Sequence, residues 1–307
     1  MIYDIRHRTD YAYTAPVAFS HHLLHLEPRT TYRQRVHAQS LVVEPVPVWG
    51  DRRQDAFGNP ARAITIDREH RRLTVEARAT VEVTAPAIPD PAATKPWEAV
   101  ADACRQANEA GALGAARFAF ASPFTPGDDV AEDYARQSFT QGRPVLAAAL
   151  DLNHRIFRDF SFDPSATSVA TPVADVFRLR RGVCQDFAHL MLAALRSLGL
   201  PARYVSGYLL TQPPAGQERL IGSDVSHAWV SLWVGTDGWV DLDPTNDLLP
   251  ADGHITLAWG RDYGDVSPIV GVVYGGGGHE LEVAVDVVPA MADMGISAAP
   301  SEVFNDL

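Results

Sequence analysis

Residues 181–200 read RGVCQDFAHLMLAALRSLGL, and this stretch decides how the rest of the chain is interpreted. Apolar side chains recur in it at steps of three and four residues, which is the spacing of one face of an α-helix. These side chains are Phe187, Leu190, Met191, Ala194, Leu195 and Leu198. Gly182 precedes the apolar run, and Gly199 and Pro201 follow it. The pattern therefore predicts a helix that begins at or next to Cys184 and ends before Pro201.

The predicted helix places a thiol at its first turn. Cys184 would face the unpaired backbone N–H groups and the positive end of the helix dipole, both of which stabilise a thiolate. Asp186 lies where a carboxylate favours a helix N-terminus. A lone cysteine is most often a structural residue, so its position alone assigns no chemistry. Cys104, the second cysteine, lies in an alanine-rich stretch that indicates inert core packing.

Composition narrows the class of protein. The chain has 307 residues, enough for two domains, with 46% hydrophobic residues and a net charge of −12. Because nucleic acids need basic patches and no Lys/Arg block is present, we expect no nucleic-acid partner. No apolar run reaches the roughly 18 residues of a membrane span, and the N-terminus does not resemble a signal peptide. We therefore expect a cytoplasmic protein without a membrane partner, in which two cysteines form no disulfide framework.

Patterns on either side of the helix suggest four regions. Residues 1–88 alternate polar and apolar side chains between turn signals, which predicts an antiparallel β-domain. Residues 89–158 follow as a proline-rich linker and a helical segment. Residues 159–288 hold the helix at Cys184 and several short β-rich spans, and we interpret them as the core. Residues 289–307 are small and polar, as in an extended tail.

Two further residues complete a chemical pattern with Cys184. His227 lies in SDVSHAWVSLWV and Asp243 in GWVDLDPTN, each within a predicted strand after the helix. A thiol nucleophile needs a nearby base, and that base needs a third group that orients it. Taken alone, His227 is typical of a core histidine and Asp243 of a turn. Together, in this order, they indicate a Cys-His-Asp triad.

These stretches resemble the transglutaminase-like superfamily, in particular bacterial members with a separate β-rich N-terminal domain. The resemblance rests on RRGVCQDFAHLMLAALRSLGLPARYVSGYL, SHAWVSLWV and GWVDLDPTN, and extends to HITLAWGRDYGDVSPIVGVVYGGGGHELEV, APVAFSHHLLHLEPR and QDAFGNP. It implies an α+β, papain-like core, in which a helix headed by the cysteine packs on an antiparallel sheet. It also implies that Cys184, His227 and Asp243 are the catalytic residues.

The expected reaction is attack of the Cys184 thiolate on an amide carbonyl of a peptide, protein or small amide, which gives a thioester. Water or a primary amine would then release the acyl group. We favour hydrolysis over true transglutaminase activity, because residues 158–169 hold Phe160 and Phe162 where animal relatives use a tryptophan as oxyanion donor. The alternative to an enzyme is an interaction module that has lost its catalytic activity. The loop 211–224 is expected to form part of the pocket wall.

Metal and cofactor sites are not expected. His21, His22 and His25 cluster in SHHLLHL, but no cysteine or carboxylate set completes a metal site there. The run 241–247 resembles a calcium loop but has Asn246 where glycine belongs. No CxxC or HExxH pair supports zinc, and the glycines at 275–278 have no following helix, as a phosphate loop would, and indicate a hairpin.

Overall fold

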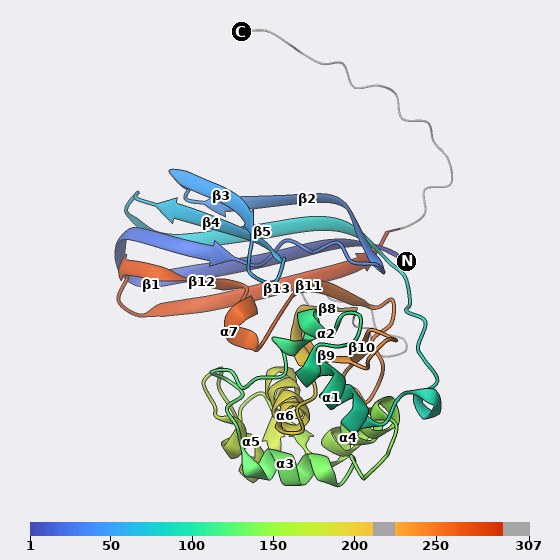
Figure 1. Cartoon of the computed structure of the whole chain (residues 1–307). Coiled ribbons are helices and arrows are strands. Elements are labelled where there is room, and N and C mark those ends of the chain that lie inside the picture. Colours follow the sequence, from blue (N-terminus) through green and yellow to red (C-terminus); the bar gives the residue numbers. More distant parts are fainter. Residues whose placement is uncertain (211–224, 291–307) are drawn as a thin grey trace, which may run out of the picture.

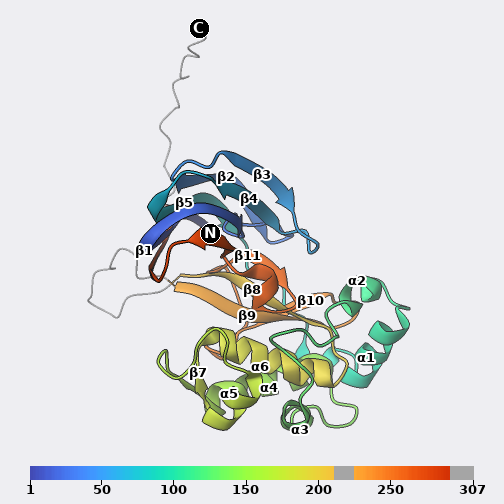
Figure 2. The same ribbon diagram turned by 90° about the vertical axis from the view of Figure 1, so that its left-hand side faces the viewer.

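The computed structural model describes residues 1–210 and 225–290 (Figure 1). The loop 211–224, expected in the pocket wall, and all but the first two residues of the expected tail 289–307 lie outside the described residues. The described part has three layers: a large sheet, a smaller sheet and a group of helices (Figures 1 and 2). The α+β fold with an N-terminal antiparallel β-domain is thereby confirmed.

The large sheet is built from the N-terminal region. Its strands are β1 (Ile2–Leu24), β2 (Gln34–Glu44), β3 (Trp49–Gln54), β4 (Pro60–Ile66) and β5 (His70–Val83), in the spatial order β2-β5-β1-β4-β3. All neighbours are antiparallel. Tyr3, Ile5 and His7 are buried on β1 while the residues between them are more exposed, which is the alternation that predicted the strand.

Two strands from the far end of the chain join this sheet. β12 (Ile269–Gly275) and β13 (His279–Pro289) both pair antiparallel with β1, so the sheet has seven strands. The sequence analysis assigned everything up to residue 288 to the core, and here the structure differs. Alternation along residues 281–287 identifies a strand but does not identify its partner, which is more than 260 residues away. The glycines of 275–278 do not form the predicted hairpin, because β12 and β13 follow one another along β1 and their described residues do not pair with each other. They join the two strands instead, with positive φ at Gly275, Gly276 and Gly277.

The helical layer comes from the middle of the chain. Its members are η1 (Pro91–Ala93), α1 (Trp97–Gln106), α2 (Ala112–Ala116), α3 (Asp129–Arg136), α4 (Val145–Asp159), α5 (Val173–Leu179) and α6 (Cys184–Ser197). α6 begins at Cys184 as predicted. Residues 186–196 are buried without interruption, because α6 contacts α3, α4 and α5 as well as the small sheet. The single apolar stripe predicted from the sequence therefore understates how central this helix is.

The small sheet separates the helices from the large sheet. It holds β8 (Ala202–Leu209), β9 (Val225–Trp233), β10 (Trp239–Leu242) and β11 (His254–Gly260) in the antiparallel order β10-β9-β8-β11. Gly207 on β8 is required for packing, because a Cβ there would lie 2.1 Å from the Ile255 carbonyl oxygen. A short parallel pair, β6 (Ser161–Phe162) with β7 (Arg181–Gly182), leads into α6, and α7 (Tyr263–Val266) follows β11.

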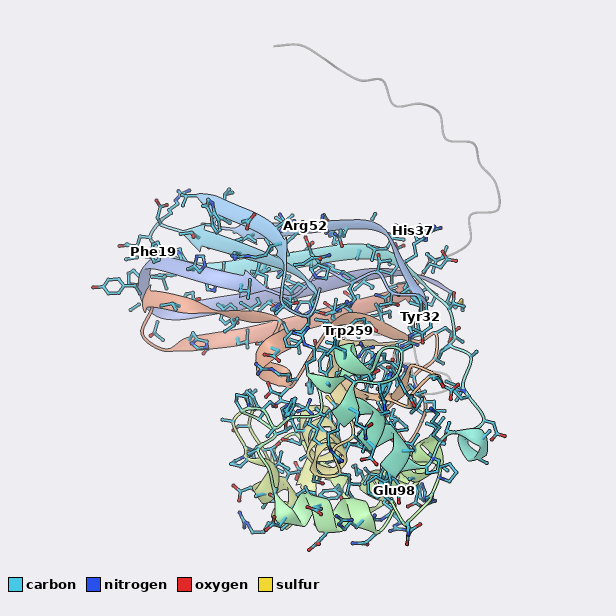
Figure 3. All side chains as sticks on the ribbon, viewed as in Figure 1. Phe19, Tyr32, His37, Arg52, Glu98 and Trp259 are labelled. Carbon is cyan, nitrogen blue, oxygen red and sulfur yellow. The ribbon has the colours of Figure 1, made fainter. Side chains whose placement is uncertain are left out.

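Side chains fill the space between the layers (Figure 3). One hydrophobic core runs from the helices through the small sheet to the large one, and includes Tyr3 and Ile5 of β1 and Val285 and Val287 of β13. A second, smaller core lies within the N-terminal sheet around Leu73. Among the described residues, no helix is long and apolar enough to cross a bilayer.

Candidate active site

Three different elements bring the predicted site residues together. Cys184 is the first residue of α6, His227 lies on β9, and Asp243 directly follows β10. β9 and β10 pair antiparallel with Val230 opposite Leu242, so the end of β10 runs alongside His227. At the start of α6, the Asp186 carboxylate accepts a 2.7 Å hydrogen bond from the Val183 N–H and so fixes the first turn.

The three side chains form a continuous hydrogen-bonded chain. His227 Nε2–H donates to Asp243 Oδ2 over 2.7 Å, and the same imidazole hydrogen-bonds the Cys184 side chain. Asp243 and His227 are buried, whereas Cys184 is partly exposed to a cleft. The carboxylate is therefore shielded from water, while the sulfur remains accessible to a substrate.

Asp243 receives more hydrogen bonds than a triad alone would supply. Its Oδ1 accepts from the Thr245 and Asn246 backbone N–H groups at 3.0 and 3.2 Å. Its Oδ2 also accepts from Asn246 Nδ2 at 2.7 Å and from His254 Nε2 at 3.2 Å. Burial raises the pKa of the Asp243 carboxyl, but the hydrogen bonds from His227, His254 and Asn246 outweigh it and hold the pKa below its ordinary value. Asp243 is thus an anion at neutral pH.

The charge of Asp243 sets the state of His227. Burial lowers the pKa of His227, but the hydrogen bonds with Asp243 and Cys184 act in the opposite direction and raise it to about 10. An imidazolium therefore lies between the carboxylate and the sulfur at neutral pH. A cation in this position is what stabilises a thiolate.

The cleft in front of the sulfur has a volume of about 460 Å³ and two walls. The core contributes one wall, and the large sheet contributes the other through β1 and β13. Core residues of the lining are Val183, Cys184, Gln185, Tyr204, Ser206, Ser226, His227, Ala228 and Tyr263; sheet residues include His7, Thr9, Tyr11, Leu281, Val283 and Val285. The N-terminal domain is therefore part of the candidate site, a role that the sequence analysis did not assign.

His7 connects the two walls. Its Nδ1 hydrogen-bonds the Tyr208 hydroxyl at 2.9 Å, and its Nε2 hydrogen-bonds Thr9 Oγ1 at 2.9 Å. Burial lowers the pKa of His7 to about 4, so this ring is neutral at neutral pH. The contact joins β1 to β8 immediately beside the cleft.

Several residues at the site escaped prediction. His254 and Asn246 both lie in stretches that carry the family resemblance, yet no local pattern shows that they contact Asp243. Phe160 is buried against Phe187, Phe162 is exposed, and neither lines the cleft. No tryptophan lines the cleft among the described residues. The tryptophan donor of the animal relatives thus has no counterpart among the described residues that line the cleft.

His227, Asp243 and His254 also bring three potential metal ligands within 4.8 Å of one another. Both histidines direct Nε2 at the same carboxylate oxygen, and the Asn246 amide donates to that oxygen as well. Ligand atoms 2.7 Å apart would subtend about 80° at a metal 2.1 Å from each, well below the tetrahedral angle. The arrangement favours a hydrogen-bonded carboxylate over a metal centre.

Comparison with known proteins gives the family. Residues 3–82 match the bacterial transglutaminase-like N-terminal region, and residues 132–244 match the transglutaminase-like superfamily. An uncharacterised protein of Mycobacterium tuberculosis is 38% identical over 301 residues, which cover 95% of this chain and 94% of that protein. One from Mycobacterium leprae is 33% identical over 288 residues, or 92% and 96% of the two chains.

Two further similar proteins have names that state an enzymatic activity. The protein-glutamine gamma-glutamyltransferase of Pseudomonas aeruginosa is 36% identical over 120 residues, which are 38% of this chain and 18% of that enzyme. A Cytophaga hutchinsonii protein proposed to be a cysteine protease has the same fold, with a TM-score of 0.72, 21% identity and coverage of 98% and 94%. These findings support a cysteine-dependent enzyme of acyl transfer or hydrolysis in general. The chain belongs to the transglutaminase-like superfamily.

Proposed function

We propose that the protein hydrolyses an amide or peptide bond through a thioester on Cys184. The observation that carries this proposal is the hydrogen-bonded chain from Cys184 through His227 to Asp243, with the sulfur open to a cleft. Cys184 is the nucleophile, His227 the general acid and base, and Asp243 the group that orients the ring.

In the first half-reaction the Cys184 thiolate attacks the amide carbonyl carbon, and a C–S bond forms. The His227 imidazolium gives its proton to the leaving nitrogen as the C–N bond breaks, so an amine departs and a thioester remains. In the second half-reaction, neutral His227 takes a proton from water, and the resulting hydroxide attacks the thioester. A carboxylic acid leaves, and the thiolate–imidazolium pair is restored.

Two donors are available for the oxyanion. As the first residue of α6, Cys184 has a backbone N–H without an acceptor inside the helix. Tyr204 lines the cleft on the core side, and no hydrogen bond joins its hydroxyl to a described residue. Burial, and then the charge of Cys184, raise the pKa of Tyr204 well above its ordinary value, so the hydroxyl keeps its proton and can donate it.

Hydrolysis is preferred over transfer to an amine because the cleft admits water. Polar side chains of Gln185, Ser206 and Ser226 line it next to Cys184, and Ser226 is exposed. Transfer is the second candidate, favoured by the similarity to the gamma-glutamyltransferase over 120 residues. Both reactions share the same thioester and differ only in what attacks it.

The test is a glutamine-containing peptide incubated with the wild type and with Cys184→Ser, with and without a fluorescent primary amine. We expect ammonia and the same peptide with glutamate in place of glutamine to form with the wild type alone, at a rate that the amine leaves nearly unchanged. Incorporation of the amine above the rate of hydrolysis would establish the transferase instead. Equal turnover by Cys184→Ser would exclude the thiol mechanism.

A further inference from the structure

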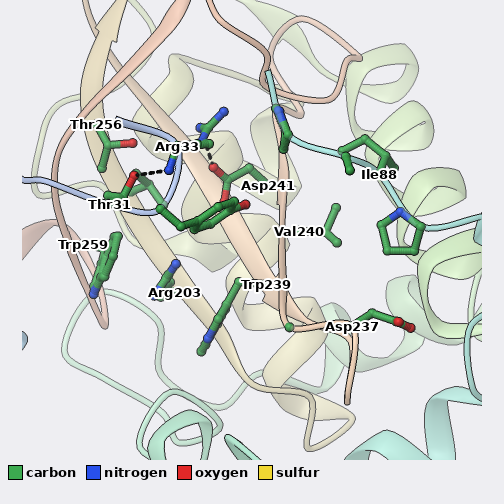
Figure 4. A pocket seen from close by; sticks show the side chains of 16 residues that line it. Thr31, Arg33, Ile88, Arg203, Asp237, Trp239, Val240, Asp241, Thr256 and Trp259 are labelled. Carbon is green, nitrogen blue, oxygen red and sulfur yellow. Dashed lines mark hydrogen bonds and ion pairs between the residues drawn. The ribbon is translucent and has the colours of Figure 1, made fainter. Parts of the chain in front are cut away.

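A second cavity, of about 540 Å³, lies on the opposite face of the small sheet from Cys184. Figure 4 shows the side chains that line it. Successive residues of β8 point to opposite faces of the sheet. Tyr204 and Ser206 line the cysteine cleft, whereas Arg203 and Val205 line the second cavity. The same strand thus separates two distinct cavities, and the proposed chemistry uses only one of them.

The remaining walls of this cavity come from three sources. β10 and β11 contribute Trp239 and Trp259, residues 31–33 reach in from the large sheet, and residues 86–89 of the proline-rich linker form the outer side. Figure 3 shows Tyr32 and Trp259 at the junction between the large sheet and the rest of the molecule. The connection between β1 and β2 and the linker that leads from β5 to the helices therefore both border the cavity.

Arg203 is the cation in this cavity that forms no hydrogen bond with a described residue, although the charge of Asp241 acts on it. Its guanidinium carbon lies 4.2 Å from the centre of the Trp239 ring and 3.7 Å from that of Trp259 (Figure 4). Because the rings cover its faces, its N–H donors point outward only along the edge of the guanidinium plane. The Nε atom is buried without a hydrogen bond, and no described residue accepts one from the rest of the group.

The neighbouring cations are already paired. Arg33 Nη2 donates to Asp241 Oδ2 over 2.9 Å, and its Nη1 donates to the carbonyl oxygens of Pro250 and Ala251. Arg29, which also stacks on Trp259, donates to the Phe57 carbonyl and the Asn59 side chain. Arg29 Nε is also buried without an acceptor, but among these three cations only Arg203 forms no hydrogen bond with a described residue.

The other lining groups define what would fit beside Arg203. Ile88, Val205 and Val240 offer apolar surface, and Asp237 at the exposed rim adds a negative charge. A planar oxyanion can accept two parallel hydrogen bonds from a guanidinium edge. Asp237 and Asp241 disfavour a doubly charged phosphate, so a singly charged carboxylate on an apolar body matches the site best.

We propose that this cavity binds an organic carboxylate, held at the edge of Arg203 with its apolar part against Ile88 and Val240. A free carboxylic acid and the C-terminus of a peptide share this chemistry. 3-Phenylpropionate and N-acetyl-L-phenylalanine represent the two sources, and their amides are uncharged controls of the same shape.

Calorimetric titration of the full chain tests the proposal. At least one carboxylate should bind ten-fold or more tightly than its amide and than phenyl phosphate, and the better of the two identifies the source. Equal binding of acid and amide, tighter binding of phenyl phosphate, or no binding of either acid would overturn the proposal.

Variants locate the binding. Arg203→Gln should weaken it at least ten-fold, Ile88→Trp should block it by filling the cavity, and Asp237→Asn should tighten it up to about three-fold by removing a rim charge. Ser226→Trp, which fills the cysteine cleft instead, should leave the affinity within two-fold. Wild-type affinity in Ile88→Trp, or its loss in Ser226→Trp, would place the ligand elsewhere, even if Arg203→Gln fails to fold.

Discussion

The two walls of the cysteine cleft hold one histidine each, and these two side chains differ in charge. His227 on the core wall and His7 on the sheet wall are 6% and 2% exposed. Burial lowers the pKa of His7 to about 4, whereas Asp243 and Cys184 outweigh the same effect and raise that of His227 to about 10. Equal burial thus produces a neutral ring that joins two layers and a charged ring suited to proton transfer. The carboxylate partner makes the difference.

Removing that partner should have the largest effect. Asp243→Asn keeps the shape of the side chain but removes the charge that raises the pKa of His227. We expect kcat to fall by about a thousand-fold to ten-thousand-fold. In the wild type, activity should persist until the pH approaches about 10, where His227 loses its proton, and this alkaline limit should move to lower pH in the variant. An unchanged pH profile of kcat would contradict the role given to Asp243.

Tyr204→Phe removes a hydroxyl from the core wall without changing its packing. If that hydroxyl stabilises the oxyanion, kcat should fall by about a hundred-fold with little change in KM. The matched control is Tyr11→Phe on the sheet wall of the same cleft, which should alter kcat by less than about three-fold. Similar losses in both variants would show that Tyr204 has no special role.

His254 should act on the reaction only through Asp243. His254→Leu removes one donor to the carboxylate, and we expect kcat to fall by about ten-fold, the value of one hydrogen bond to a charged group. His254→Gln can restore an N–H donor and should recover most of the activity. Steady-state kinetics and the pH profile of both variants test this, and a purely structural role would make glutamine no better than leucine.

Acid should destabilise the folded protein through neutral buried histidines of the large sheet and of α6, while His227 keeps its charge. Burial lowers the pKa values of His7, His22 and His189 to about 4, below the ordinary 6.5. The unfolded chain therefore binds more protons between these values, and the free energy of unfolding should decrease as the pH falls from 6.5 to 4.

Replacing one of these histidines tests whether the free energy of unfolding does decrease as the pH falls. Between pH 6.5 and 4, the free energy of unfolding should decrease by about 1 to 2 kcal/mol less in His7→Gln than in the wild type, as measured by urea unfolding. Tyr208→Phe, which removes the hydroxyl bonded to His7 but leaves the ring, should retain the pH-dependent loss. A steeper decrease in His7→Gln would mean that His7 is charged in the folded protein.

The two walls also differ in how far the sequence predicts them. The start of α6 at Cys184 can be predicted from the glycines and the spacing of apolar residues within a stretch of twenty residues. The strands near His227 and Asp243 can be predicted from the local alternation of polar and apolar residues. The sheet wall depends on β13 pairing with β1, with Tyr3 opposite Pro289. Alternation specifies a strand and its buried face, but the partner is chosen by packing of the whole chain.

The same limit applies to contacts within the site. His254 lies at the start of β11, eleven residues after Asp243, and its hydrogen bond depends on how β11 crosses to pair with β8. The cavity at Arg203 likewise needs two tryptophans from two strands and the linker beside them. Fold class and the family were predictable from local motifs, whereas the roles of Cys184, His227 and Asp243 in catalysis stay a prediction.

The most direct test of the account is the alkylation rate of Cys184 by iodoacetamide at pH 6, measured by peptide mass spectrometry in the wild type and in His227→Ala. Cys104 is the internal control, since it is buried and burial raises the pKa of its thiol. An imidazolium beside the sulfur predicts that wild-type Cys184 reacts at least about a hundred-fold faster than Cys104 and that His227→Ala loses most of this advantage. Equal rates for Cys184 in the two proteins would contradict the proposed thiolate–imidazolium pair.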